Sequence, residues 1–366
     1  MKTSRISLHQ MFALLVLFLS SSATLTGVGR YSGQDIWIVF LISSILGTIL
    51  YTIYYRISKL NEFEPLPNIL KKTFGKWLGT LLNIGYIGYF FYIATGLLKS
   101  IGDMIEVTLM VDASMILILV LLMIPVVYGM ILGVNTIGRS SELLFYVVCI
   151  SFVTLVLAVL SSDIFQLENF LPVLENGFDG IKTDIYRVTL FPYGEAITFL
   201  LIFPLIPSQG RGKILKYSYV GIVIATIILL GIDMMNIGIL GADLTKNFLY
   251  PFYNSMKMVG VNVIFERLDP IAIVILMTTC FFKLSIYFYA TLVSLEKLVL
   301  RFNYRQLALV CSVLLIIASL LISKSHVETI YLAIIGLPKW ILPVFQVALP
   351  LVIWIISEVK NQMKKA

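Results

Sequence analysis

Charged residues are scarce in this chain. Only 13% of its 366 residues are Asp, Glu, Lys or Arg, whereas 59% are apolar, and the mean hydropathy is +0.96. A soluble domain has roughly 25% charged and roughly 45 to 50% apolar residues. The composition therefore predicts a protein that uses the lipid bilayer as its solvent. No Pro/Ser-rich linker or charge run divides the chain, so we expect one integral-membrane domain over residues 1–366.

Cysteine and histidine are also rare, which excludes several kinds of site. The three cysteines, Cys149, Cys280 and Cys311, all lie in apolar stretches, where a thiol behaves as a small hydrophobe. They offer neither a disulfide framework nor a CxxC metal pair. The two histidines, His9 and His326, lie far apart and lack a ligand partner at helical spacing, so the sequence predicts no metal site.

Catalytic and nucleic-acid-binding patterns are missing as well. No loop contains a Gly-rich phosphate motif, a nucleophile elbow or a paired-carboxylate motif, and the loops are too short to hold a catalytic domain. We therefore expect no enzymatic activity and no cofactor. The net charge of +7 is scattered over short loops and does not form one patch, so we expect no nucleic acid partner.

Long apolar runs, by contrast, are abundant. A membrane-spanning helix needs about 20 mostly apolar residues. Ten windows meet this requirement: 7–29, 35–57, 77–101, 113–133, 141–161, 183–207, 214–240, 268–298, 306–323 and 331–357. Because ten is even, both termini are expected on the same side of the membrane.

The loop charges predict which side that is. If the N-terminus is cytoplasmic, most of the 27 Lys and Arg residues fall in cytoplasmic segments, and most acids, including Asp103 and Glu106, fall in the opposite loops. This is the asymmetry that the positive-inside rule describes. Two loop segments, 64–76 and 247–261, resemble amphipathic helices on the membrane surface, with ordinary interfacial loops as the alternative.

The sixth window contains a strong helix-breaking sequence. It reads Phe191-Pro192-Tyr193-Gly194-Glu195, and Pro192 removes a helix hydrogen bond while Gly194 permits unusual dihedral angles. Transporter folds place their ligand sites at such interruptions, because unwound backbone exposes N–H and C=O groups within the membrane. The alternative is a simple proline kink.

A matching break is expected in the first window if the chain consists of two inverted halves. The polar triplet Ser20–Ser22 lies midway along this window. Serine hydroxyls can also bond to their own helix and merely bend it, which is the alternative. A second position is Thr26–Gly29, where the helix would more simply end.

Two ionisable residues lie at mid-membrane depth. Lys283 is roughly 22 Å from either end of the 268–298 window at 1.5 Å per residue, too far to reach water readily. We expect it to face an internal cavity, or else to be a structural counter-ion. Glu195, beside the break, is its natural partner, and the pair could relay a proton. Asp233, with Asn236, lies nearer the outer end and is expected to face water or to line an access route.

Six short motifs follow one another along the chain. They are Ile6-Ser7-Leu8-His9-Gln10, Gln34-Asp35-Ile36-Trp37, Phe74-Gly75-Lys76-Trp77-Leu78-Gly79, Phe191-Pro192-Tyr193-Gly194-Glu195, Glu266-Arg267-Leu268-Asp269 and Lys283-Leu284-Ser285-Ile286-Tyr287. Each motif alone is weak. Their order and spacing over nearly the whole chain resemble the B subunits of spore germinant receptors, which belong to the amino acid-polyamine-organocation transporter superfamily.

This resemblance implies a fold and a site. The fold is all-α, with ten transmembrane helices in a five-plus-five inverted repeat, the repeats covering about 7–161 and 183–357, and helices 1 and 6 broken. The ligand pocket would lie between the first, third, sixth and eighth helices and would hold Ser21, Ser22, Tyr89, Gly194, Glu195, Lys283 and Tyr287. Relatives typically have glycine at the first-helix break, where this chain has serine, so the backbone contacts there are not carried over.

The resemblance also implies a role. Family members act with an A subunit and a lipoprotein C subunit in the inner membrane of the dormant spore, where a small germinant such as an amino acid or nucleoside triggers dipicolinate release. A receptor subunit with cytoplasmic termini is therefore expected. A proton-coupled amino acid transporter is the alternative, because one pocket could serve both functions. The sequence does not identify the ligand.

Overall fold

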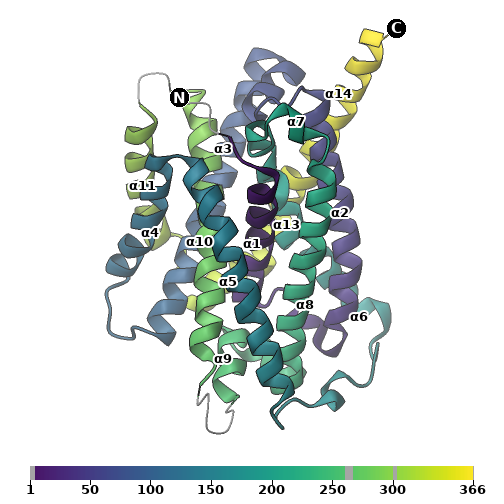
Figure 1. Cartoon of the computed structure of the whole chain (residues 1–366), viewed down its shortest axis with the longest axis vertical. Helices are drawn as coiled ribbons and strands as arrows, with labels where there is room; N and C mark the ends of the chain where they lie inside the picture. Colours follow the sequence, from purple (N-terminus) through teal and green to yellow (C-terminus); the bar gives the residue numbers. More distant parts are fainter. Residues whose placement is uncertain (1–4, 260–266, 300–302, 366) are drawn as a thin grey trace.

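The computed structural model of the protein describes residues 5–259, 267–299 and 303–365, and the regular structure within these ranges is helical (Figure 1). The all-α membrane fold expected from the composition is confirmed. Glu266 of the fifth motif and the last two residues of the 247–261 segment lie outside the described residues.

Nine helices in these ranges are long and apolar enough to cross a membrane. They are α1 (Leu8–Thr26), α2 (Ile36–Leu60), α3 (Leu66–Thr108), α4 (Met115–Leu132), α5 (Val134–Leu160), α8 (Ile214–Asn247), α10 (Asp269–Glu296), α11 (Tyr304–Leu321) and a final run, Pro343–Met363, that includes most of α14 (Leu349–Lys365). Each overlaps one of the predicted windows.

The remaining predicted window, the sixth (183–207), is helical but divided. It comprises α6 (Gly177–Val188), a π-helical turn η3 (Thr189–Tyr193) and the 3-10 turns η4 (Gly194–Leu201) and η5 (Phe203–Leu205). The shorter connecting elements are η1 (Arg30–Asp35), η2 (Leu167–Phe170), α7 (Ser208–Arg211), α9 (Pro251–Met258), α12 (His326–Tyr331), η6 (Leu332–Gly336), α13 (Leu337–Trp340) and η7 (Pro343–Ala348).

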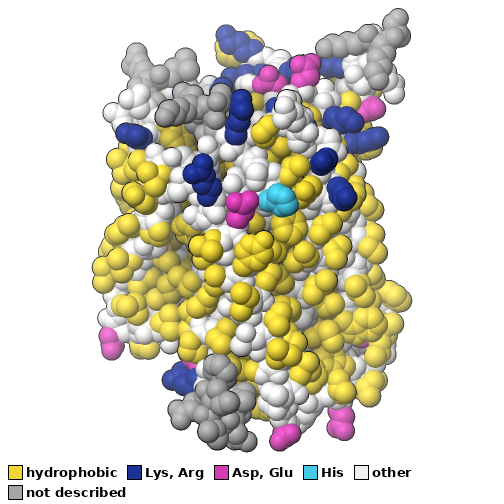
Figure 2. Space-filling model, viewed as in Figure 1, with side chains coloured by type: hydrophobic (Ala, Val, Ile, Leu, Met, Phe, Trp, Pro, Cys, Tyr) yellow, Lys and Arg dark blue, Asp and Glu magenta, His cyan; other side chains and the backbone are white. Residues whose placement is uncertain are grey.

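The molecule has two chemically different ends. The start of α1 and the end of α14 lie toward the same end, at the top of Figure 1. On the face drawn in Figure 2, an apolar band covers the middle, and Lys and Arg side chains gather above it toward that end. We call this end the terminal end and the opposite one the far end. An apolar belt of this extent fits a bilayer and not water.

Helix α1 runs through the centre of the bundle and packs against α5, α8 and α10 (Figure 1). Ser7 and Gln10 form a capping box that fixes its start, and Gly27, with φ of +60°, ends it in the left-handed conformation that glycine tolerates best. Most of its side chains are buried. This central position explains why even its serine and threonine side chains, from Ser20 to Thr26, are buried.

The break expected at Ser20–Ser22 is wrong, because α1 is continuous through these residues. The hydroxyls of Thr24 and Thr26 donate to the carbonyls of Ser20 and Ser22, and such bonds one turn back leave the helix intact. The chain leaves helical geometry at Gly27, the second position considered.

Both predicted amphipathic segments contain helix where the structure describes them: 64–76 holds the first turns of α3, and 247–261 holds α9. Gly75, with φ of +82°, separates the first turns of α3 from its long membrane-spanning part. Leu66 and Ile69 in these first turns are buried, as are Phe252 and Met256 of α9. The apolar faces of both helices therefore pack against the rest of the protein.

Candidate functional site

The predicted interruption of the sixth span is confirmed and is more than a kink. Backbone angles leave the helical region at Phe191, where φ is −128° and ψ is +102°, within the π-helical turn η3, and the 3-10 turn η4 follows in place of a continuing α-helix. Phe191 precedes Pro192, whose ring disfavours helical geometry in the residue before it. Broken backbone thus lies beside a buried carboxylate, that of Glu195.

Gly194 leaves room at the break for a neighbouring side chain. Its own backbone angles are ordinary helical ones, so the dihedral freedom expected from the sequence is not what the position uses. A Cβ atom here would lie 2.3 Å from Oε1 of Gln346, which lies in η7. The Tyr54 hydroxyl links the backbones of these two segments, since it lies 3.1 Å from the Gly194 carbonyl and 2.7 Å from the Gln346 carbonyl.

Glu195 and Lys283 form an ion pair at the centre of the protein. Both side chains are 1% exposed. The Lys283 ammonium also donates to the Ser22 hydroxyl at 2.6 Å, and it lies 4.7 Å from the ring centroid of Phe191 and 5.2 Å from that of Phe18. One ammonium group therefore joins α1, the broken sixth span and α10. Pairing offsets the desolvation of two charges that the membrane interior would otherwise disfavour.

The other predicted site residues lie close by in different roles. Tyr89 accepts a hydrogen bond from Nε2 of Gln346 at 2.8 Å, and its ring stacks on Phe345 with centroids 5.0 Å apart. The Tyr287 hydroxyl faces Glu195 and Tyr89, and among the described residues it makes no hydrogen bond of good geometry. Ser21, the residue before Ser22 in α1, faces Cys280 of α10 and not the ion pair.

A narrow cavity reaches the ion pair from the direction of the far end. Ser22, Glu195 and Lys283 line its inner part, whereas Ser21, Tyr89, Gly194 and Tyr287 do not line it. Its walls are mainly apolar and aromatic, and its other polar lining comes from hydroxyls: Thr26, Ser100, Ser323 and Thr329. Three of the seven predicted residues therefore line one cavity, and the other four do not. An apolar cavity with a few convergent polar groups is the usual form of a small-molecule site.

Two polar features of this region were missed from the sequence. Gln346 is fully buried and contacts both Gly194 and Tyr89, but a single glutamine in an apolar window gave no signal. Asp103, assigned to an outer loop, is instead fully buried in α3 and pairs with Lys99 one turn away. The spacing of Lys99, Asp103 and Glu106 on one helix was the available signal.

The expectation for Asp233 is also corrected. Its side chain does not face water, because the residue is 1% exposed. Oδ1 accepts a hydrogen bond from Asn236 at 3.1 Å, and Asn236 in turn accepts one from Ser255 of α9 at 2.7 Å. These contacts link a polar cluster inside the protein, in which Oδ2 of Asp233 has no hydrogen-bond partner among the described residues. Asp233 does not line the cavity that reaches the ion pair.

Comparison with solved structures places the fold. The chain is similar to a mutant of a manganese transporter from Eremococcus coleocola, with a TM-score of 0.56 over 98% of this chain and 85% of that one, at 14% identity. A likeness at this identity concerns the fold alone. The fold that the resemblance implies, the LeuT-like fold of amino acid-polyamine-organocation transporters, is confirmed by this neighbour.

Comparison of sequences places the family. The chain is 29% identical to spore germination protein KB of Bacillus subtilis (strain 168) over all of its own length and 98% of that protein. It is 24% identical to spore germination protein YndE of the same organism, over 79% of each chain. A family model described as spore germination protein matches residues 5–327. The chain therefore belongs to the permease-type family of spore germination proteins.

Proposed function

We propose that this protein is the B subunit of a spore germinant receptor and that its ligand binds at the Glu195–Lys283 pair. The observation that carries this proposal is a buried ion pair beside a helix break, at the inner end of a cavity. A protein that needed only stability would do as well with apolar residues at these positions, since buried pairs often contribute little net stability.

A zwitterionic amino acid fits this arrangement best. Its carboxylate would take the place of Glu195 on the Lys283 ammonium, its ammonium group would bind Glu195, and its side chain would lie against the apolar wall. A nucleoside would instead use the pair as donor and acceptor for its polar edges. In either case the ligand exchanges one set of charged contacts for another, so that little desolvation remains uncompensated.

Signalling would follow from that exchange. The pair and Ser22 together hold three helices, so a ligand that separates the pair changes the relative stability of two arrangements of the bundle. Only a difference in ligand affinity between the two states can shift their populations. Partner A and C subunits would detect the change, in the inner membrane of the spore.

The same proposal orients the chain. The terminal end, where Lys and Arg gather in Figure 2, would face the spore cytoplasm, and the ligand would enter from the far end. Residues 7–161 and 183–357 would be the two inverted repeats, with the interrupted sixth span opening the second repeat.

Proton-coupled amino acid transport is the second candidate. It is favoured by the transporter fold and by a carboxylate and an amine that could exchange a proton when the ligand arrives. The two functions differ in what leaves the protein: a receptor sends a conformational signal, whereas a transporter moves the ligand itself.

Germination assays on spores test the proposal. We would measure dipicolinic acid release over a panel of amino acids and nucleosides from spores that lack only this gene, complemented with wild type, Lys283→Ala or Lys182→Ala. Lys182 is the matched control, because it is a surface lysine paired with Asp179. Loss of response to one ligand class, restored by Lys182→Ala and not by Lys283→Ala at equal membrane abundance, is expected.

Two other results would overturn it. An unchanged response from Lys283→Ala at equal abundance would exclude the ion pair from ligand detection. Full response of the deletion strain to every ligand, with saturable substrate uptake by the purified protein in proteoliposomes, would favour the transporter.

A further inference from the structure

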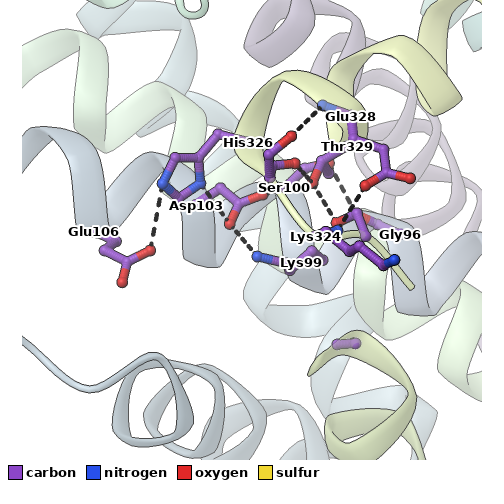
Figure 3. Close-up of polar contacts among 12 residues, drawn as sticks. Gly96, Lys99, Ser100, Asp103, Glu106, Lys324, His326, Glu328 and Thr329 are labelled. Atoms are coloured by element: carbon purple, nitrogen blue, oxygen red, sulfur yellow. Dashed lines mark hydrogen bonds and ion pairs between the residues drawn. The ribbon is translucent and has the colours of Figure 1, made fainter. Parts of the chain in front are cut away.

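Three side chains with metal-binding chemistry meet near the far end, apart from the Glu195–Lys283 pair. Asp103 and Glu106 lie one turn apart on α3, and His326 is the first residue of α12 (Figure 3). Nδ1 of His326 lies 2.9 Å from Oδ1 of Asp103, and Nε2 lies 3.6 Å from Oε2 of Glu106. One ligand atom from each residue can be chosen so that all three lie within 4.8 Å of one another.

The imidazole contacts are not hydrogen bonds of ordinary geometry. Nδ1 of His326 is buried and has no hydrogen-bond partner among the described residues, even though a carboxylate oxygen is 2.9 Å away. The N–H direction therefore does not point at that oxygen. The neutral imidazole can therefore offer one ring nitrogen to a cation, because no hydrogen bond among the described residues engages Nδ1.

The local structure holds these residues in place. The Ser325 hydroxyl accepts from the backbone N–H of Glu328 and caps α12, and the Glu328 carboxylate accepts from the backbone N–H of Lys324. Asp103 is fully buried in α3, and its Oδ2 accepts a hydrogen bond from the Thr329 hydroxyl at 2.7 Å. His326 and Glu106 are each about one third exposed or less, so the cluster remains partly accessible.

We propose that Asp103, Glu106 and His326 form a binding site for a divalent transition-metal ion, with Zn²⁺ as the best match. One imidazole nitrogen and two carboxylate oxygens are three protein ligands, and water would complete the tetrahedron. The Thr329 hydroxyl would orient the Asp103 carboxylate from behind, as the partners of metal ligands commonly do.

Lys99 gives the site a built-in competitor. Its ammonium group contacts Oδ1 of Asp103, the same oxygen that faces His326. Without a cation, Lys99 neutralises the buried carboxylate, and a bound cation would displace it. Removal of the lysine charge should therefore strengthen metal binding. A cluster that serves only as an ion-pair network would not gain metal affinity in this way.

A bound ion would link two parts of the cavity wall. Ser100 of α3 and Thr329 of α12 both line the cavity that reaches Lys283. A cation shared by α3 and α12 would hold these two segments together at the far-end side of the cavity. The site therefore adds a metal dependence that the proposed receptor function does not itself require.

Zn²⁺ titration of the purified full-length protein in detergent tests the site. Isothermal titration calorimetry is expected to show one ion per wild-type chain. His326→Ala and Glu106→Gln should weaken binding by about tenfold or more. His9→Ala is the matched control, since it removes the second histidine, which lies near Lys213 and Lys216 where a cation would be repelled. Lys99→Met should bind more tightly than wild type.

Thermal unfolding supplies a second measurement. Zn²⁺ should raise the melting temperature of wild type and His9→Ala but not of His326→Ala, whose metal-free melting temperature shows whether it is folded. Equal affinity of wild type and His326→Ala would overturn the proposal. So would a lack of saturable binding by both wild type and Lys99→Met.

Discussion

The Glu195–Lys283 pair allows a quantitative test of the site. Both side chains are 1% exposed, and the ammonium group also bonds to Ser22 of α1. Removal of one partner leaves the other charge buried without compensation, which typically destabilises a protein by about 3 to 5 kcal/mol. We therefore expect Lys283→Met and Glu195→Gln each to lower the free energy of unfolding by this amount.

The double variant should behave differently from the sum of the two. Without the two charges, no ion has to be desolvated and none is left unpaired. Replacement of a buried ion pair by uncharged groups is often neutral or stabilising. We expect the double variant to lie within about 1 kcal/mol of wild type, which implies a coupling energy of about 5 kcal/mol or more between the two sites.

The measurement is equilibrium unfolding of the four proteins in one detergent, with germinant-triggered dipicolinic acid release from spores that carry each of them at matched abundance. All three variants should fail to respond, including the stable double variant. Additive single effects, or single effects below about 1 kcal/mol, would refute the strong coupling inferred from burial. A responsive double variant would show that the ligand does not need these charges.

Three further predictions concern the surroundings of the pair. Gly194→Ala should destabilise the protein by about 1 to 3 kcal/mol, because the new Cβ would lie 2.3 Å from Gln346 Oε1, whereas Gly88→Ala, with nothing within 4 Å, should be tolerated; thermal unfolding compares the two. Tyr54→Phe should cost about 1 kcal/mol in the same assay, and an unaltered melting temperature would contradict its role in fastening the break. Ser22→Ala should shift the ligand concentration for half-maximal germination while leaving maximal dipicolinic acid release intact, and an unchanged dose response would exclude Ser22 from the site.

The central pair was predictable because charged residues are rare within membrane-spanning segments. A lysine in the middle of a long apolar window and a glutamate beside Phe191-Pro192 each stand out from their surroundings, and the absence of other buried carboxylates nearby suggested the partnership. The interruption of the sixth span was likewise visible, since proline restricts its own backbone and that of the preceding residue. Its exact form was not, because the role of Gly194 depends on Gln346, which lies far along the chain.

The serine triplet of α1 shows the opposite case. Ser20–Ser22 could break a helix or remain in one, and packing of α1 against its neighbours decided for the continuous helix. The same holds for Asp103 and His326, which are distant in the sequence and share no local motif. Only the packing of α12 on α3 brings the imidazole to the carboxylates.

The sequence by itself therefore determined the membrane fold, the positions of the spans, the sixth-span break and the two buried charges. Each of these follows from local chemistry: the length of an apolar run, the backbone limits of proline, the free energy of an ion in lipid. The tertiary structure alone decided which hydroxyl joins the ion pair, which side chain packs against Gly194, and that a histidine meets two carboxylates at the far end. Those contacts join residues distant in the chain, and no local pattern specifies which helix faces will meet.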